Sequence, residues 1–165
     1  MKFNYYGFKA IYAHEMNRFL RTVGQSLLSP VISTSLYFVV FGSVIGGYIQ
    51  KIDGVSYGSY IVPGLLMLTL LTQSISNTSF GIFFPKFNGT INEILAAPIS
   101  TLETVLAFVG AGATKTLIVG AVIYATASFF AEVTVEYPML MIFLLVLVSF
   151  TFALFGFLIG VVSKN

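Results

Sequence analysis

Four long apolar runs constrain what this chain can fold into more than any other feature of its sequence. They cover about residues 23–49, 60–84, 105–131 and 139–162. A helix needs ~20 mostly apolar residues to cross the ~30 Å hydrocarbon core of a bilayer, and each run is long enough. Only 8% of the 165 residues are charged, whereas an average soluble domain has about 25%. The sequence therefore predicts an all-α membrane protein with four transmembrane helices.

The segment before these runs, residues 1–22, has a different pattern. On a helical wheel, one arc collects Tyr5, Phe8, Ile11, Tyr12, Met16 and Phe19, and the opposite arc collects His14, Asn17, Arg18 and Arg21. This pattern is typical of an amphipathic helix that lies in the membrane surface. Glu15 interrupts the apolar arc, where it is within reach of Arg18 or Phe19 along the helix. The alternative is that the segment simply extends the first span into the cytoplasm.

The distribution of basic residues predicts the orientation of the chain in the membrane. With a cytoplasmic N-terminus, the inner side receives Lys2, Lys9, Arg18, Arg21, Lys86 and Lys164. The outer side receives Lys51 together with Asp53, Glu132 and Glu136. Membrane proteins usually carry the excess of Lys and Arg on the cytoplasmic side. We therefore expect a multi-pass protein whose two ends and residues 85–101 face the cytoplasm.

Residues 85–101 form the one sizeable cytoplasmic loop expected from these spans. Pro85 and Pro98 bracket it, and its "FNGT" sequence predicts a turn. The following "TINEILAA" predicts a short amphipathic helix capped by Thr90, with Glu93 as the capping-box partner. The apolar face of this helix comprises Ile91, Ile94 and Leu95. A loop that only joined two spans could be much shorter, which favours a role in binding a cytoplasmic partner. The alternative is that this apolar face rests on the bilayer. Composition alone does not distinguish the two.

The second span carries a stripe of polar side chains. The stripe comprises Thr69, Thr72, Gln73, Ser76 and Ser79, with Asn77 next to it. Such side chains usually bond to their own backbone or to a neighbouring helix, so we expect packing first and the lining of a water-filled path second. The pairs Gly42/Gly46 and Gly156/Gly160 are G-x-x-x-G motifs, which predict close packing of helices.

Lys115 is the one charged residue inside a predicted span. A lysine at the bilayer centre costs ~2.5–3.5 kcal/mol, which makes it a functional candidate by default. Sixteen residues separate it from Glu132, and at ~1.5 Å per residue this places Lys115 near the inner edge of the hydrocarbon core. We therefore expect Lys115 to snorkel to the headgroups, or to form a structural ion pair with Glu103, in preference to contacting a substrate.

Several kinds of chemistry have no support in the sequence. The chain has no cysteine, and its single histidine, His14, precedes the first span, so neither a metal cluster nor a buried Ser–His pair is available. The "GAGATKT" segment at residues 110–116 is not a phosphate-binding loop, because Val109 and Thr114 occupy the two glycine positions. A net charge of +2 gives no reason to expect nucleic acid. We therefore expect no cofactor or metal bound by this chain and no enzymatic activity.

Several motifs, taken in order, resemble the permease subunits of type-2 ATP-binding-cassette (ABC) exporters. They are "HEMNRFLR", "YFVVFGSVIGG", "GSYIVPGLLM" with Pro63 and Gly64, and an E-x-L-x-x-P-I-S string with Glu93, Leu95, Pro98, Ile99 and Ser100, followed by glycines and Lys115. The resemblance covers essentially the whole chain. It points to the bacterial inner-membrane permeases that export drugs and polysaccharides.

This resemblance implies a six-span fold that dimerises and sits on two ATPase subunits, where ATP and Mg²⁺ are bound. The cytoplasmic loop is then the coupling element, and its implied ATPase contacts are Lys86, Glu93, Ile94, Leu95 and Pro98. The implied partners are an ABC ATPase, a second permease chain and membrane lipid.

The sequence departs from the implied pattern, because only four spans precede Asn165. Two further spans would be expected, so a truncated product, or a second chain that supplies the missing half, stays open. A non-catalytic four-span scaffold or assembly protein, or an inactive permease fragment, is the alternative. An intramembrane enzyme is weakly supported, since the spans offer Lys115 as their one charged group.

Overall fold

The computed structural model describes residues 3–41, 51–52, 54–131, 133 and 135–163. The helices are α1 (Tyr5–Arg21), α2 (Val23–Val39), α3 (Tyr57–Phe87), α4 (Ile91–Ala96), α5 (Thr101–Phe130) and α6 (Pro138–Val162). The strands β1 (Lys51–Ile52) and β2 (Val55–Ser56) form one short antiparallel hairpin. The predicted fold class, an all-α membrane protein, is confirmed.

Three of the predicted spans are continuous helices. α3, α5 and α6 are each long and apolar enough to cross a membrane. α2 is an apolar helix of 17 residues, and a π-helical turn follows it at residues 40–41. The rest of the first predicted span lies outside the described residues, as do Gly42, Gly46 and the charged residues Lys2, Asp53, Glu132 and Lys164.

Local capping explains where α5 begins. The Ser100 hydroxyl accepts a hydrogen bond from the Glu103 backbone N–H, and the Glu103 carboxylate accepts one from the Ser100 N–H at 2.8 Å. This capping box starts α5 four residues before the predicted span at 105.

The capping box predicted for the loop helix is wrong, although the helix itself is present as α4. Thr90 has a helical backbone conformation instead of the extended one that favours a cap, and its side chain caps no N–H group of α4. Its hydroxyl donates to the Pro85 carbonyl at 3.4 Å.

The hairpin was not predicted, because strands of two residues are too short to show an alternating pattern. Lys51 pairs with Ser56 and Ile52 pairs with Val55. Gly54, with φ +84°, adopts the left-handed backbone conformation in the turn between them.

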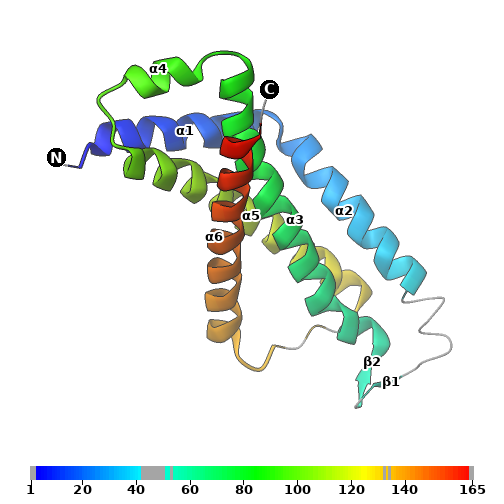
Figure 1. The fold of residues 1–165 in the computed structure, drawn as a ribbon. Helices are drawn as coiled ribbons and strands as arrows, with labels where there is room; N and C mark the ends of the chain where they lie inside the picture. Colours follow the sequence, from blue (N-terminus) through cyan, green and yellow to red (C-terminus); the bar gives the residue numbers. More distant parts are fainter. Residues whose placement is uncertain (1–2, 42–50, 53, 132, 134, 164–165) are drawn as a thin grey trace.

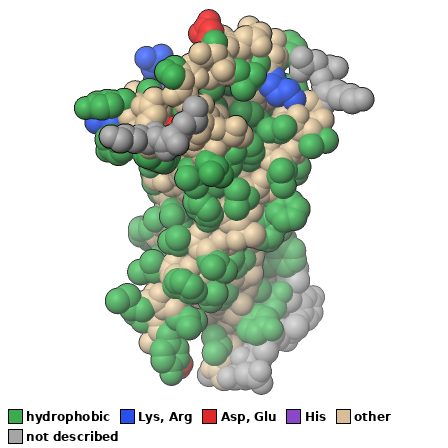
Figure 2. Space-filling model, turned by 60° about the vertical axis from the view of Figure 1, so that its left-hand side comes forward, with side chains coloured by type: hydrophobic (Ala, Val, Ile, Leu, Met, Phe, Trp, Pro, Cys, Tyr) green, Lys and Arg blue, Asp and Glu red, His purple; other side chains and the backbone are tan. Residues whose placement is uncertain are grey.

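The two ends of the helix bundle carry different elements. Figure 1 shows α1 lying across one end of the α3–α5–α6 bundle, beside α4 and the C-terminal end of α6, with the hairpin at the opposite end. On the face shown in Figure 2, Lys and Arg side chains gather at the α1 and α4 end, and hydrophobic side chains cover the body below. A protein that sits in a bilayer needs such an apolar surface.

Glycines bring the long helices together. Gly156 and Gly160 of α6 lie against the α3 backbone at Ile75 and Ser79, and a Cβ at Gly156 would lie only 2.5 Å from the Ile75 carbonyl oxygen. The close packing predicted for this G-x-x-x-G pair is therefore confirmed. On α5, Gly120 similarly makes room for Leu70 of α3.

Candidate functional site

α4 and the turns around it form the first candidate site. Gly89, with φ +77°, ends α3, and the chain then leads into α4, which lies at the α1 end of the bundle (Figure 1). The Leu95 side chain is 74% exposed, Glu93 and Pro98 are exposed, and Ile94 is half-buried. We call these four residues, Glu93, Ile94, Leu95 and Pro98, the α4 surface.

Lys86 does not belong to this surface. It lies in the last turn of α3, and its ammonium donates to the carbonyls of Gly160, Val161 and Ser163 at 3.2, 2.8 and 2.7 Å. The last carbonyls of a helix have no partner within it and carry partial negative charge, so a cation stabilises them. Lys86 therefore links the end of α3 to the end of α6. Because its ammonium is used in this contact, we do not include Lys86 among the proposed ATPase contacts.

Glu103 connects the end of the loop to the start of α1. Its carboxylate accepts hydrogen bonds from the backbone N–H of Asn4 at 2.6 Å and from that of Ser100. The Asn4 side chain donates to the Pro98 carbonyl at 3.1 Å and also caps α1 by accepting from the Gly7 N–H. The first turns of α1 and α5 and the last residues of the loop are thus one hydrogen-bonded unit.

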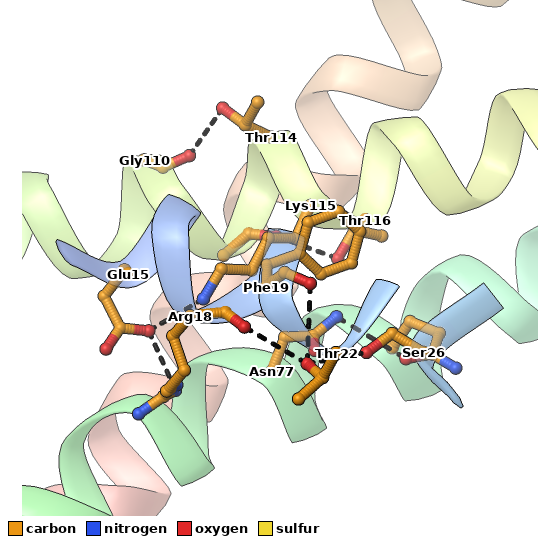
Figure 3. Close-up of polar contacts among 12 residues, drawn as sticks. Glu15, Arg18, Phe19, Thr22, Ser26, Asn77, Gly110, Thr114, Lys115 and Thr116 are labelled. Atoms are coloured by element: carbon orange, nitrogen blue, oxygen red, sulfur yellow. Dashed lines mark hydrogen bonds and ion pairs between the residues drawn. The ribbon is translucent and has the colours of Figure 1, made fainter. Parts of the chain in front are cut away.

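Lys115 is paired with Glu15, not with the predicted partner Glu103. Its ammonium donates to the Glu15 carboxylate at 2.7 Å, and Arg18 donates to the same oxygen at 2.9 Å. Figure 3 shows both cations converging on this carboxylate, Lys115 from α5 and Arg18 from α1. We call Glu15, Arg18 and Lys115 the charge cluster.

The charge cluster overturns the snorkelling expectation and explains an anomaly in α1. Lys115 and Glu15 are only 3% and 2% exposed, so the ammonium is turned into the protein and away from the headgroups. Glu15 interrupts the apolar arc of α1 because that arc faces α5. Two misplaced charges, one in an apolar arc and one in a span, were the sequence signal that could have identified the pair.

Neighbouring contacts hold the cluster between three helices. A Cβ at Gly81 of α3 would lie 3.3 Å from the Glu15 carboxylate, so this glycine leaves the space that the carboxylate occupies. One turn away, the Tyr12 hydroxyl donates to Thr114 at 2.9 Å. Further along α1, Phe19 packs with Val119 and Ile123. α1 therefore runs alongside α5 from its first turn as far as Ile123, and polar links fix it there.

The polar stripe of α3 is satisfied mainly within its own helix. Thr69 donates to the Leu65 carbonyl at 2.8 Å, and Thr72 donates to the Leu68 carbonyl at 3.0 Å. Gln73 accepts a long hydrogen bond of 3.5 Å from Asn77. Thr72 and Ser76 are exposed, while Thr69 and Gln73 are half-buried. The stripe thus lies on an outer face of this chain and lines no path within its described part.

The "GAGATKT" segment at residues 110–116 is helical and forms no loop. Residues 110–116 are helical within α5, and the Thr114 hydroxyl donates to the Gly110 carbonyl at 2.8 Å. A phosphate-binding loop instead follows a strand and leaves its backbone N–H groups free for the ligand. Within the described ranges, no group of three or more His, Cys, Asp or Glu side chains is placed to hold a metal ion.

Comparison with known proteins gives a family match over nearly the whole chain. Residues 6–165 match the family model described as ABC-2 type transporter. The chain is 38% identical over 157 residues to the inner membrane transport permease YadH of Escherichia coli K12, an alignment that covers 95% of this chain and 61% of that protein. YadH of Shigella flexneri gives the same values.

The chain therefore spans less than two thirds of the length of these curated relatives. No solved structure matches it significantly. The family match nevertheless extends from the second residue of α1 through α6, across the whole helical architecture described above. This chain belongs to the ABC-2 type transporter family.

Proposed function

We propose that this chain is the membrane-spanning permease subunit of an ATP-driven ABC exporter, with ATP and Mg²⁺ bound and hydrolysed by a separate ATPase subunit. The observation that carries the proposal is the family match over residues 6–165. The relative YadH is itself named an inner membrane transport permease. The substrate class that follows from the resemblance is a drug-like molecule, a lipid or a polysaccharide.

The proposed location is the bacterial inner membrane, with the N-terminus, α1 and α4 on the cytoplasmic side. The basic residues Lys9, Arg18 and Arg21 all belong to α1, at the end of the molecule that also carries α4 (Figure 1). An excess of basic residues marks the cytoplasmic side. α1 crosses the bundle end as a helix in the membrane surface would, and Lys9 and Arg21 are exposed on it.

The α4 surface is the proposed docking site for the ATPase. An exposed leucine flanked by an exposed glutamate gives a small amphipathic contact on a short helix outside the bundle. Movement of α4 would reach α5 through Pro98 and the Ser100–Glu103 capping box, and would reach α1 through Asn4. Such coupling requires that the two states of the ATPase make different contacts with α4.

The polar stripe is proposed to line the transport path together with a second permease chain, in a homodimer or in a pair of different chains. Thr69, Thr72, Gln73 and Ser76 lie on an outer face of α3 within this chain. Thr69 and Thr72 bond to their own helix. The Gln73 amide has only a long bond of 3.5 Å to Asn77, and such an amide is costly to place against hydrocarbon. Protein or water against this face would remove that cost, which favours an assembly over a single chain in lipid.

Co-purification with the ABC ATPase that functions with this permease tests the proposal. We expect Leu95→Asp to reduce ATPase capture at least ten-fold, because a charge replaces the most exposed apolar side chain of the α4 surface. Leu102→Asp is the matched control, since Leu102 is equally exposed, at 74%, but lies on α5.

Unchanged capture by both variants would show that α4 is not the docking site. Failure of the unaltered chain to bind any ABC ATPase would instead favour the alternative, a non-catalytic membrane scaffold or assembly protein.

A further inference from the structure

A cavity of about 790 Å³ lies where α1, α2 and the end of α3 meet. Its walls differ in chemistry. Arg18, Thr22, Gln25 and Ser26 line it from α1 and the start of α2, while Phe80 and Phe84 line it from α3. Both phenylalanines are more than half exposed. A site with a polar wall and an aromatic wall suits a molecule that is itself polar at one end and apolar at the other.

The polar wall has a surplus of positive charge. The charge cluster contains two cations, Lys115 and Arg18, and one carboxylate, Glu15, so its net charge is +1. None of the described residues that line the cavity is acidic. Glu15 and Lys115 are buried, so the surplus positive charge is accessible at the partly exposed Arg18, where an anion in the cavity would neutralise it.

Arg18 is the group that connects the cluster to the cavity. Its side chain is 37% exposed, whereas Glu15 and Lys115 are buried. One guanidinium nitrogen bonds to Glu15, and the planar fork of five N–H donors leaves the others for a second acceptor. Phosphate oxygens match that fork in geometry and charge. Figure 3 shows the Thr22 hydroxyl at the backbone carbonyl of Arg18, and Ser26 next to Thr22, where the chain leads into α2.

The apolar wall indicates that the phosphate belongs to an amphiphile. Phe80 and Phe84 lie on successive turns of α3, a helix long and apolar enough to span the membrane. A chain that follows them from the cavity therefore runs along the membrane-spanning helix as far as Phe80, one turn before Ser76 of the polar stripe. A free phosphate ion would leave both aromatic side chains uncovered, whereas an acyl chain would cover them.

We propose that this cavity binds one anionic membrane phospholipid, with its phosphate on Arg18 and Ser26 and an acyl chain along Phe80 and Phe84. The cavity reaches Thr90, the residue before α4, but none of the four residues of the α4 surface lines it. The lipid site can therefore be tested separately from ATPase docking.

Lipid binding to the purified, delipidated full chain in a neutral detergent tests the proposal. Phosphatidylglycerol is titrated in mixed micelles, and native mass spectrometry counts the lipids bound per chain. We expect one tight site, with affinity at least ten-fold lower in Arg18→Gln, because a charge-assisted hydrogen bond is lost. Arg21→Gln is the matched control: Arg21 is exposed on the same helix but does not line the cavity, and we expect its affinity to be unchanged.

Two further variants keep the test decisive if Arg18→Gln disturbs the fold. Phe84→Ala and Ser26→Ala leave every contact of Glu15 intact, and each is expected to weaken phosphatidylglycerol binding several-fold. Phosphatidylcholine, whose headgroup has no net charge, is expected to bind at least ten-fold more weakly. Inorganic phosphate at the same concentration is expected to displace no lipid.

Two results would overturn the assignment. One is equal affinity of the unaltered chain, Phe84→Ala and Ser26→Ala for phosphatidylglycerol, which would mean that the lipid binds elsewhere. The other is displacement of the lipid by inorganic phosphate, which would assign the cavity to a free anion.

Discussion

The contact of α1 with α5 and the contact of α3 with α6 hold this chain together by different means. Between α1 and α5 there are polar contacts: Asn4 bonds to Glu103, Tyr12 bonds to Thr114, and Glu15 forms an ion pair with Lys115. Along α3 and α6, Gly156 and Gly160 let the two backbones approach directly.

The difference follows from the surroundings of each contact. In hydrocarbon, apolar side chains gain little by leaving lipid for protein, so close packing at small residues drives helix association. Where α1 lies in the membrane surface, as proposed above, polar pairs are both available and directional. We therefore infer that polar pairs fix the register of α1 on α5, whereas shape fixes the position of α6 on α3.

The largest effect is expected from a substitution that breaks the polar contact between α1 and α5. Glu15→Leu should lower the free energy of unfolding by ~3–5 kcal/mol, because it leaves the Lys115 ammonium buried with no counter-charge. Lys115→Met should cost less, since Glu15 keeps Arg18 as a partner. Unfolding in mixed micelles, followed by circular dichroism, measures both values.

The double variant Glu15→Leu/Lys115→Met sharpens this prediction. We expect it to be more stable than Glu15→Leu alone, because neither charge is then left buried without its partner. Additive losses in the double variant would mean that the two side chains do not act as a pair.

The next effect tests the glycine contact. Gly156→Ala should lower the free energy of unfolding by ~1–3 kcal/mol, because the added methyl group has no space against the Ile75 carbonyl and the two helices must separate. Gly64→Ala on α3 is the matched control, since a Cβ there meets no atom within 4 Å. The same unfolding measurement should separate the two variants, and equal stability would show that α6 does not rely on close approach.

The smallest effect concerns Lys86, which makes the polar link between α3 and α6 seen among the residues that the structure describes. Lys86→Met should cost ~1 kcal/mol, because the ammonium stabilises the carbonyls at the C-terminal end of α6 but is partly exposed to solvent. Hydrogen exchange of the last turn of α6 should increase, while exchange in α1 stays the same. Lys9→Met, which changes an exposed lysine of α1, should alter neither.

The sequence predicts the helices well and their partners poorly, for one physical reason. Spans follow from the transfer of consecutive residues into lipid, which is a local property, so α3, α5 and α6 lie close to the predicted runs. Which side chain of α1 meets Lys115 depends on the rotation and register of two separate helices. Glu103 therefore looked like a plausible partner, although its carboxylate is used by Ser100 and Asn4.

In the α4 region, too, the sequence predicts the helix but not its contacts. A short helix was predicted correctly between two prolines, but its predicted cap was not. The role of Lys86 was missed because its acceptors, the carbonyls of Gly160, Val161 and Ser163, lie more than seventy residues further along the chain. A contact of that kind leaves no local pattern in the sequence.

The proposal that α4 lies in the cytoplasm and docks an ATPase can be tested directly by labelling a single cysteine. The chain has no cysteine of its own, so Leu95→Cys introduces a unique thiol on the α4 surface. Tyr137→Cys, at an exposed position at the start of α6, is the control for the opposite side.

We expect a membrane-impermeant maleimide to label Leu95→Cys only in inverted membrane vesicles, and the ATPase subunit, when co-expressed, to protect it. Tyr137→Cys should react in intact cells with or without the ATPase. Labelling of Leu95→Cys from outside intact cells would contradict the account, because α4 would then face a compartment that contains no ATPase.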